Sequence, residues 1–255
     1  MKKSDQKIVK PLNENVLKVK NLRHIYSDAA GQSEILCGLN AEFHGGQLYA
    51  IVGESGSGKT TFLSLISALD KVQSGAIEFN GRSIADIGLS RFRRDYVSIV
   101  FQSYNLIKYM TARENVEVAL DFSGKKSRPN RRTDEKSEAE NADNSRENLK
   151  EKDRAYELLK QVGLGKGKAD RLVQQLSGGE QQRVAIARCM ASRAPIITAD
   201  EPTGNLDAKT EAKILTLFKN LADAGKIVII VTHSQKVAHA DGAKILKMAD
   251  GRLMK

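Results

Sequence analysis

Residues 48–60 read LYAIVGESGSGKT, a short apolar run followed by a glycine-rich turn and a Lys-Thr pair. The apolar run predicts a buried strand at 48–52, and the apolar residues between Phe62 and Leu69 recur at helical spacing. A strand, a glycine turn and a helix in this order predict a phosphate-binding loop (P-loop) of the pattern G-x-x-x-x-G-K-[ST]. The residues of this loop are Gly53, Glu54, Ser55, Gly56, Ser57, Gly58, Lys59 and Thr60.

The chemistry expected of the P-loop follows from its residue types. Glycines allow backbone amides to turn inward around an anion, at the positive end of the following helix. We expect Lys59 to reach the β- and γ-phosphates of a nucleotide, and the Thr60 hydroxyl to ligate Mg²⁺. The alternative, a flexible glycine loop without a ligand, is disfavoured by the flanking strand and helix. A dinucleotide site is not expected, because its fingerprint G-x-G-x-x-G differs from the order G-x-x-G-x-G found here.

An acidic pair follows a second apolar run, in residues 196–201 (IITADE). Ligands of open α/β sheets bind at the carboxyl ends of the strands. Asp200 is therefore expected to hold Mg²⁺, directly or through water, and Glu201 to polarise the water that attacks the phosphate. A solvated turn is the alternative, but apolar residues lead directly into the pair and Pro202 ends the strand.

Further apolar segments complete an α/β pattern. Alternating residues from Val16 predict an opening strand, and residues 76–81 predict a hairpin strand with an Asn-Gly turn. Residues 97–101 and 227–232 are short apolar runs typical of buried strands in a parallel sheet. Strands in alternation with helices predict the α/β class. One amphipathic helix carries its apolar face on Ile214, Leu217, Phe218 and Leu221.

Composition limits the class of partner. The 255-residue chain carries 41 basic and 31 acidic residues, and its net charge of +10 raises nucleic acid or an anionic membrane surface as partners. Because the basic residues are spread along the chain, nucleic acid is not expected. No apolar run approaches the roughly 20 residues of a membrane helix, and none follows the basic N-terminus as a signal peptide requires. Two distant cysteines, Cys37 and Cys189, suit a reducing cytoplasm better than a zinc site or a disulfide framework.

Two segments depart from a globular composition. Residues 1–15 are expected to form a flexible basic tail, and residues 16–255 a single domain. Within that domain, residues 121–153 are dense in charged and polar side chains and have almost nothing to bury. We expect this insertion to be disordered or a frayed surface helix, because burial does not offset the entropy cost of ordering it.

A third motif precedes the acidic pair, where residues 176–183 read LSGGEQQR. Ser177 and the amides of Gly178 and Gly179 open a helix, which predicts a second phosphate-binding helix N-terminus. One chain has no obvious use for two such ends on one nucleotide, so two chains are expected to clasp each nucleotide. A capped helix without a ligand is the alternative, and it is common for Ser-Gly-Gly alone.

With these three motifs, residues 16–255 resemble the ATP-binding-cassette (ABC) ATPases, whose LSGGQ signature is similar to residues 176–180. The resemblance implies a P-loop NTPase fold of the ABC type. Its mixed core sheet is joined by an antiparallel β subdomain and by a helical subdomain, here at about residues 103–180. ATP and Mg²⁺ are the implied ligands, and ATP hydrolysis is the implied activity.

The resemblance also implies roles that local patterns do not. Gln102 matches the glutamine of the Q-loop, which senses Mg²⁺ and couples to the membrane partner. His233 matches the switch histidine, and residues 205–207 (NLD) match the D-loop that crosses the dimer interface. Tyr26 stands where the family places the aromatic that stacks on adenine, and Thr61 extends the nucleotide-binding set of the P-loop. Taken alone, a strand-end glutamine, a single histidine and a surface tyrosine are more often structural.

Residues 101–107 (FQSYNLI), 111–116 (TARENV) and 201–207 (EPTGNLD) resemble the lipoprotein-release and macrolide-efflux branch, the LolD/MacB type. This branch implies a homodimer around two ATP that drives a separate MacB/LolC-like permease, an integral membrane protein with four helices. The implied location is the cytoplasm, at the inner face of the cell membrane. Export, antimicrobial peptide resistance and lipoprotein release are the implied tasks. Lys108, where proline is common, and the long 121–153 insertion depart from the branch in the subdomain that meets the permease.

Other classes of function remain open at this stage. A cassette ATPase that acts on nucleic acid, or one that regulates cell-wall machinery through an FtsX-like partner, shares these motifs. Nucleic-acid relatives carry tandem cassettes, zinc modules or long coiled coils, whereas this sequence has one cassette, no zinc spacing and no heptad run. A P-loop kinase or a signalling GTPase is disfavoured by residues 176–183 and by the lack of a guanine-reading N-K-x-D.

Overall fold

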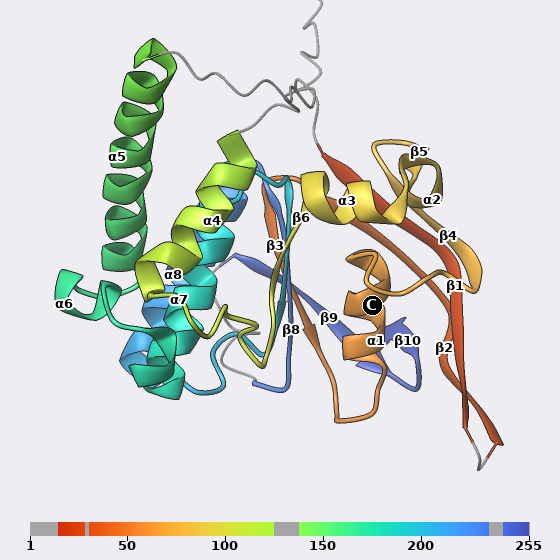
Figure 1. Ribbon diagram of the computed structural model, residues 1–255. Helices are drawn as coiled ribbons and strands as arrows, with labels where there is room; N and C mark the ends of the chain where they lie inside the picture. The colour runs from red at the N-terminus through yellow and green to blue at the C-terminus, as the bar shows by residue number, and fades with distance from the viewer. Residues whose placement is uncertain (1–14, 29–30, 125–137, 235–241, 255) are drawn as a thin grey trace, which may run out of the picture.

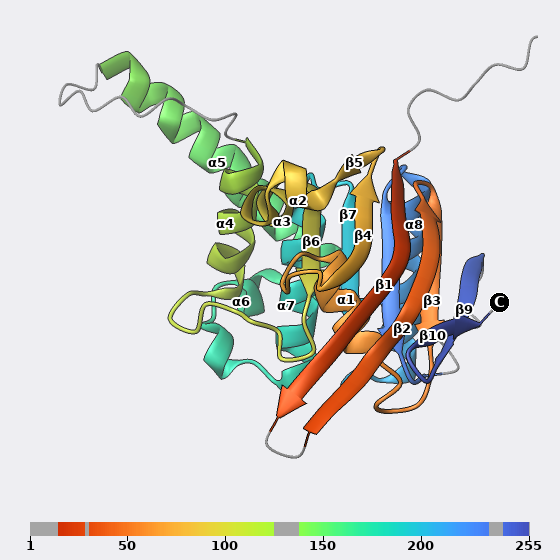
Figure 2. The same cartoon turned by 90° about the vertical axis from the view of Figure 1, so that its right-hand side faces the viewer.

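A computed structural model describes residues 15–28, 31–124, 138–234 and 242–254, with the backbone alone at 27–28, 122–124 and 138–148. Two β-sheets and a group of helices form layers (Figure 1). The six-stranded sheet stands in the middle. On one side it packs against helix α1 and the four-stranded sheet beyond it, and on the other side it is covered by the longer helices (Figures 1 and 2).

The central sheet has the strand order β10-β9-β3-β8-β7-β6. Its strands are β3 (Gln47–Val52), β6 (Val97–Val100), β7 (Ile196–Asp200), β8 (Ile227–Thr232), β9 (Ala243–Ala249) and β10 (Arg252–Met254). The first five of these pair in parallel, and β10 is antiparallel to β9. The four strands predicted from apolar runs, β3, β6, β7 and β8, lie next to one another, so the predicted parallel sheet is confirmed.

Burial on both faces explains why these strands are so apolar. In β3, Leu48 and Ala50 pack into the core beneath the helices, whereas Tyr49 and Ile51 pack into the core shared with α1 and the antiparallel sheet. Every residue of β8 is buried. Two-sided burial specifies the register, since a slip of one residue exchanges the two faces of a strand.

The antiparallel sheet has the strand order β2-β1-β4-β5. Its strands are β1 (Val16–Asp28), β2 (Gly31–His44), β4 (Ser74–Phe79) and β5 (Arg82–Ser83). The predicted Asn80-Gly81 turn follows β4, and its positive φ angles of 50° and 79° suit an Asn-Gly pair. Sequence reasoning missed β2. Its buried residues Leu36, Leu39 and Phe43 do not alternate, because bulges against β1 shift the register.

Helix α1 (Lys59–Ile66) fills the space between the two sheets. Phe62 and Ile66 are fully buried there, and the Phe62 ring lies 6.1 Å from that of Phe43 in β2. The helix follows the glycine turn as predicted and begins at Lys59, within the P-loop. It is shorter than predicted, because Leu69 lies beyond its end and is 42 % exposed.

On the other face of the central sheet, α7 (Gly178–Ala191) and α8 (Ala208–Asp223) pack against its strands. Helices α4 (Ala112–Gly124), α5 (Glu138–Gln161) and α6 (Lys166–Ala169) lie outside them, where α4 and α5 pack against α7 (Figure 1). Two short helices, α2 (Ile84–Ile87) and α3 (Leu89–Tyr96), lie between β5 and β6 in the chain. Helix α8 buries Ile214 and Phe218, which confirms its predicted apolar face, while Leu217 and Leu221 are partly buried.

The predicted α/β class, with a mixed core sheet and a separate antiparallel sheet, is confirmed. Part of the predicted insertion is helical, since α4 continues to Gly124 and α5 begins at Glu138. Residues 125–137 of the insertion and 1–14 of the predicted tail lie outside the described residues. In the part of the chain that the structure describes, no helix combines the length and the apolar character needed to cross a membrane.

A buried pair of hydroxyl groups generates a stability prediction. The Ser67 hydroxyl, at the end of α1, lies 2.9 Å from the Thr198 hydroxyl of β7, and both side chains are fully buried. Ser67→Ala leaves the Thr198 hydroxyl without this partner, so we expect a loss of about 1–3 kcal/mol of unfolding free energy. Adding Thr198→Val should restore most of the loss, because the pair is then replaced by apolar groups of similar shape. Urea denaturation measures both variants, and a double variant no more stable than the single one would contradict the prediction.

Candidate functional site

The P-loop is held where two strands from different sheets approach its backbone. A Cβ added to Gly53 would lie 2.2 Å from the Met248 carbonyl oxygen of β9. A Cβ added to Gly58, whose φ is 99°, would lie 2.9 Å from the Ile35 carbonyl oxygen of β2. Glycine is required at both positions, because no side chain fits this close approach. Helix α1 begins at Lys59, within the loop, so the end of the loop carries the first N–H groups of the helix, which have no partner within it.

Lys59 and Thr60 of the P-loop contact different groups. The Lys59 ammonium donates hydrogen bonds to the carbonyl oxygens of Gly53 (2.8 Å) and Glu54 (2.7 Å), so it folds back across the loop. The Thr60 hydroxyl lies beside the Asp200 carboxylate, at the end of β7. Burial raises the pKa of Asp200, and the neighbouring Thr60 hydroxyl opposes the rise. Two residues predicted to ligate Mg²⁺ from separate motifs are therefore neighbours.

Glu201 is held by the end of β8. Its φ of 45° lies in the left-handed region, which is costly for a residue with a side chain. One carboxylate oxygen accepts a hydrogen bond from the Thr232 hydroxyl at 2.8 Å, and the other accepts one from the His233 backbone N–H at 2.8 Å. The second oxygen also lies 2.7 Å from His233 Nδ1. The predicted base and the predicted switch histidine thus share a direct contact.

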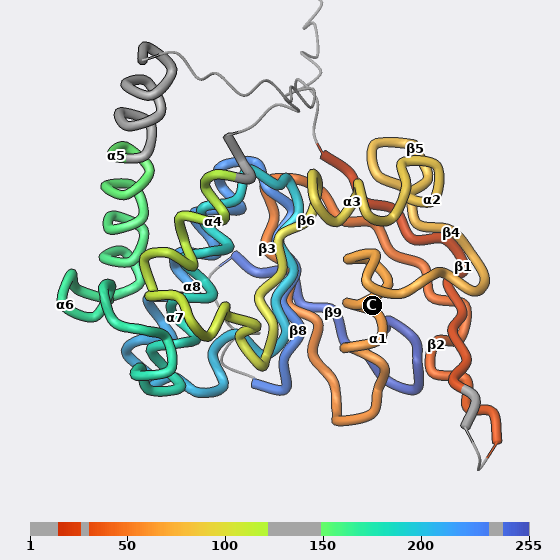
Figure 3. Tube along the Cα trace, viewed as in Figure 1, coloured from red at the N-terminus to blue at the C-terminus, as the bar shows by residue number. Residues whose placement is uncertain are grey.

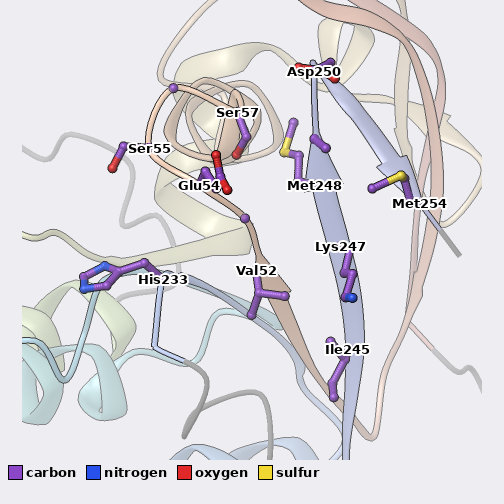
Figure 4. A pocket seen from close by; sticks show the side chains of 13 residues that line it. Val52, Glu54, Ser55, Ser57, His233, Ile245, Lys247, Met248, Asp250 and Met254 are labelled. Carbon is purple, nitrogen blue, oxygen red and sulfur yellow. The ribbon is translucent and has the colours of Figure 1, made fainter.

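Two hollows border these residues. A cavity of about 850 Å³ is lined by residues 53–57 of the P-loop, by β9 and by His233. Figure 4 shows Met248 and Lys247 of β9 on one side of the loop and His233 on the other. A second cavity of about 220 Å³ is lined by Glu201, by His233 and by the loop that follows β7. His233 borders both cavities and so connects the P-loop with the acidic pair.

The oxygen donors at this site fit the predicted Mg²⁺, whose remaining ligands would come from a bound nucleotide and water. The Thr60 hydroxyl and the Asp200 carboxylate offer two oxygen donors in one place, as Mg²⁺ prefers. Among the described residues, no group of three or more His, Cys, Asp or Glu side chains is placed to hold a metal ion. Mg²⁺ in nucleotide-dependent enzymes takes its remaining ligands from phosphate oxygens and water.

Tyr26, the predicted adenine contact, lies near the end of β1 and is 49 % exposed. Its ring meets the buried His24 ring edge to face, with centroids 4.7 Å apart. An exposed aromatic ring backed by a buried one is suited to stacking on a flat base. The assignment of Tyr26 to adenine stays a prediction.

The signature segment opens α7 as predicted, and its first turn carries a fixed negative charge. The Glu180 carboxylate accepts hydrogen bonds from the Lys168 ammonium at 2.5 Å and from the Ser177 backbone N–H at 2.9 Å. These two hydrogen bonds lower the pKa of Glu180 to about 2, and the bond from Lys168 has the larger effect. Ser177 and Gly178 are exposed, and neither lines the two cavities described above.

The Q-loop and D-loop residues lie in the loops after β6 and β7. Strand β6 ends at Val100, one residue earlier than predicted, and Gln102 is exposed in the following loop. Its exposure rules out the alternative of a buried glutamine that satisfies backbone groups. In the D-loop, the Asp207 carboxylate accepts backbone N–H groups of the first turn of α8, so this residue caps the helix.

Three residues that shape the site were missed from the sequence. Thr232 holds the Glu201 carboxylate, His24 backs the predicted adenine contact, and Met248 lies against the P-loop backbone. The position of Thr232 beside His233 was a usable signal, because neighbouring residues at a strand end share one edge of the sheet. Nothing local marks Met248, which reaches the P-loop only through the pairing of β9 with β3.

Comparison with known proteins decides the family. The family model described as ABC transporter matches residues 36–204, which contain the P-loop, the signature and the acidic pair. This chain belongs to the ABC transporter family. It is 43 % identical over 208 residues to the ABC transporter ATP-binding protein YclH of Bacillus subtilis, which covers 81 % of this chain and 83 % of YclH.

Other relatives agree in sequence and structure. The macrolide export ATP-binding/permease protein MacB of Escherichia coli (strain K12) is 34 % identical over 246 residues, covering 94 % of this chain and 34 % of MacB. The chain therefore spans about a third of the length of that relative. The dimeric bacterial ABC transporter cassette MJ0796 is 38 % identical with a TM-score of 0.79, covering 94 % of this chain and 97 % of that one. A second MJ0796 structure, a dimer bound to ADP and Pi after hydrolysis, is 37 % identical with a TM-score of 0.79.

These matches confirm the cassette fold and the predicted activity. The chain is the ATPase subunit of an ABC transporter, and ATP is its nucleotide. Its likeness to MacB and YclH agrees with the LolD/MacB-type branch to which the sequence was assigned. Membership of the ABC transporter family also excludes the P-loop kinase and the signalling GTPase.

Glu201→Gln tests the predicted base. Glutamine keeps the size of the side chain but cannot take a proton, so turnover should fall by about 100-fold or more while ATP still binds. Phosphate release measures turnover, and nucleotide titration measures binding. Glu211→Gln is the matched control, because Glu211 lines the same small cavity and should leave turnover near the wild-type value. Near-normal turnover in Glu201→Gln would remove Glu201 from this role.

Proposed function

We propose that this chain works as a homodimer that encloses two ATP molecules and drives a separate MacB/LolC-like membrane permease. Each ATP would lie between the P-loop of one protomer and the signature segment of its partner. The work done by the permease would be export, antimicrobial peptide resistance or lipoprotein release. Nucleic acid has no part in this function.

The separation of the two phosphate-binding helix starts carries this proposal. Helix α1, after the P-loop, packs in the core between the two sheets, whereas α7, after the signature, packs in the core on the other face of the central sheet. No residue of 176–180 lines either cavity beside the P-loop and Glu201. The exposed start of α7 is therefore available to a ligand held by another molecule. The dimeric state of the similar MJ0796 cassette supports the same arrangement.

Within each composite site, we assign Glu201 to activate the attacking water. Thr232 and His233 hold both oxygens of its carboxylate, which keeps its orientation constant while water and phosphate change around it. His233 is 72 % exposed and contacts Glu201 through Nδ1, so its other ring nitrogen faces outward. We assign that nitrogen to the γ-phosphate. Phosphoryl transfer depends mainly on such positioning and on charge stabilisation.

The P-loop residues would bind the phosphates. The Lys59 ammonium now bonds neutral carbonyl oxygens, and it would exchange them for phosphate oxygens, since hydrogen bonds between charged groups are stronger. Thr60 and Asp200, with Gln102 from the exposed loop after β6, would hold Mg²⁺, which neutralises phosphate charge when bound. Thr61 and Tyr26 complete the proposed set of nucleotide contacts.

A separate permease is proposed from the relatives. The name of MacB covers an ATP-binding and a permease function, and the present chain matches about a third of that protein. YclH, by contrast, is named as an ATP-binding protein alone, and 83 % of its length is covered by this chain. By analogy with YclH we assign the permease function to another protein and place this cassette at the cytoplasmic face of the membrane. The loop after β6 and α4, which carry two of the segments that resemble the LolD/MacB branch (101–107 and 111–116), are the proposed contact.

Complementation between two inactive variants tests the composite site. Lys59→Ala removes the phosphate cation, and Ser177→Arg fills the signature segment with a bulky side chain, so each homodimer should be inactive. In a mixed dimer, one site receives both defects, and the other receives an intact P-loop and an intact signature. ATPase activity should therefore reappear on mixing, measured by phosphate release at equal protomer concentrations.

Two controls give this experiment its force. Each variant at the total concentration of the mixture should stay inactive, and circular dichroism should show that both are folded. If the two sites turn over only together, ATP-driven formation of the mixed dimer replaces activity as the readout. No recovery by either measure would contradict the proposed dimer, because a monomeric enzyme keeps each defect within its own site.

Affinity purification tests the proposed permease. The Glu201→Gln variant, expressed in its native host, should co-purify from detergent-extracted membranes with an integral protein of four membrane helices and a large extracytoplasmic domain. Mass spectrometry identifies the protein, and a tagged unrelated cassette serves as the control. Recovery with ribosomes or nucleic acid, and with no integral protein, would contradict the proposed partner.

A further inference from the structure

Tyr104 connects the Q-loop with the D-loop, two segments that have separate roles in the proposed function. It lies in the loop between β6 and α4, two residues after Gln102. Its hydroxyl accepts a hydrogen bond from the Asn205 side-chain amide at 2.8 Å, and Asn205 belongs to the D-loop after β7. Figure 3 shows these two loops and the start of α7 at the same end of the molecule.

The glycines of the signature segment make room for this junction. A Cβ added to Gly178 would lie 3.1 Å from the Tyr104 hydroxyl, and a Cβ added to Gly179 would lie 3.0 Å from the Asn205 carbonyl oxygen. Both distances are tighter than ordinary van der Waals contact. The Q-loop and the D-loop therefore rest on the start of α7, and they also bond to each other.

The backbone around Tyr104 is strained and is held by one side chain. Tyr104 and Asn105 have φ angles of 64° and 47°, two successive left-handed residues that carry side chains. The Arg188 guanidinium of α7 donates hydrogen bonds to the carbonyl oxygens of both, at 2.9 Å and 2.5 Å. Among the described residues it forms no ion pair with a carboxylate. Burial lowers the pKa of Arg188.

We propose that Tyr104 is a positioning residue whose hydroxyl holds the D-loop in a set place relative to the Q-loop and the signature segment of the same chain. This inference rests on the proposed function, in which the D-loop and the signature of one protomer meet the nucleotide of its partner. ATP binds the P-loop of its own protomer, which Tyr104 does not touch. Loss of the hydroxyl should therefore lower kcat and leave KM for ATP nearly unchanged.

Tyr104→Phe removes the hydroxyl and keeps the ring. We expect kcat to fall about fivefold, the size of one lost neutral hydrogen bond, with KM and melting temperature close to wild type. In an Asn205→Ala background the same substitution should change kcat by less than about twofold, because the partner of the hydroxyl is already absent. Tyr109→Phe is the matched control, since Tyr109 lies in the same loop and is 80 % exposed.

Hydrogen exchange of the nucleotide-free protein gives a readout that does not depend on ATP hydrolysis. Peptides from residues 201–208 should exchange about threefold faster in Tyr104→Phe than in wild type, whereas Tyr109→Phe should leave them unchanged. Inactivity of the wild-type protein would count against the proposed function, and exchange would then decide this inference by itself. Unchanged exchange would overturn the inference. So would an equal fall of kcat in the presence and absence of Asn205.

Discussion

The parallel pairing of β3 with β8 and β9 is the constraint on which the site depends. Val52, the last residue of β3, pairs with Thr232 on one side and with Lys247 on the other. Burial on both faces prevents β3 from changing register, because a slip of one residue would bring each core residue to the wrong side. The P-loop, the end of β8 and the backbone of β9 therefore arrive at one edge of the sheet.

Strand β7 extends the same constraint to the acidic pair. Asp200 pairs with Val231, so Glu201 comes beside Thr232 and His233. The left-handed backbone of Glu201, a conformation that costs about 1–3 kcal/mol, persists because the end of β8 holds its carboxylate and its backbone N–H bonds to Val231. Strain of this kind is expected where the surroundings over-determine the position of a side chain. The geometry of the acidic pair is thus a property of the sheet rather than of its own loop.

The two helix starts that could bind phosphate have different surroundings within one chain. The start of α1 lies under the edges of both sheets, through the close contacts at Gly53 and Gly58. The start of α7 lies instead against the loops after β6 and β7, through Gly178 and Gly179. This division gives a physical basis for a site shared between two copies. It also places the loop after β6 in direct contact with the signature segment, through Tyr104 and Gly178.

The sequence by itself determined those elements whose signal is contiguous. The P-loop with its strand and helix, the strand that ends in Asp200, and the amphipathic α8 all lie within runs of neighbouring residues, so a local period or spacing was sufficient to identify them. The family, and with it ATP hydrolysis, also followed from short motifs. Strand β2 was not predicted, because its bulges interrupt the alternation of buried and exposed residues by which a strand is identified.

Only the tertiary structure decided which of these residues meet. The bond between Thr232 and Glu201, the approach of Met248 to Gly53, and the junction of Tyr104 with Asn205 join residues that are distant in the chain. Each depends on strand order, on register, or on a glycine that lets two backbones come close. Those quantities are set by packing the whole core at once, and no local pattern of residues records them.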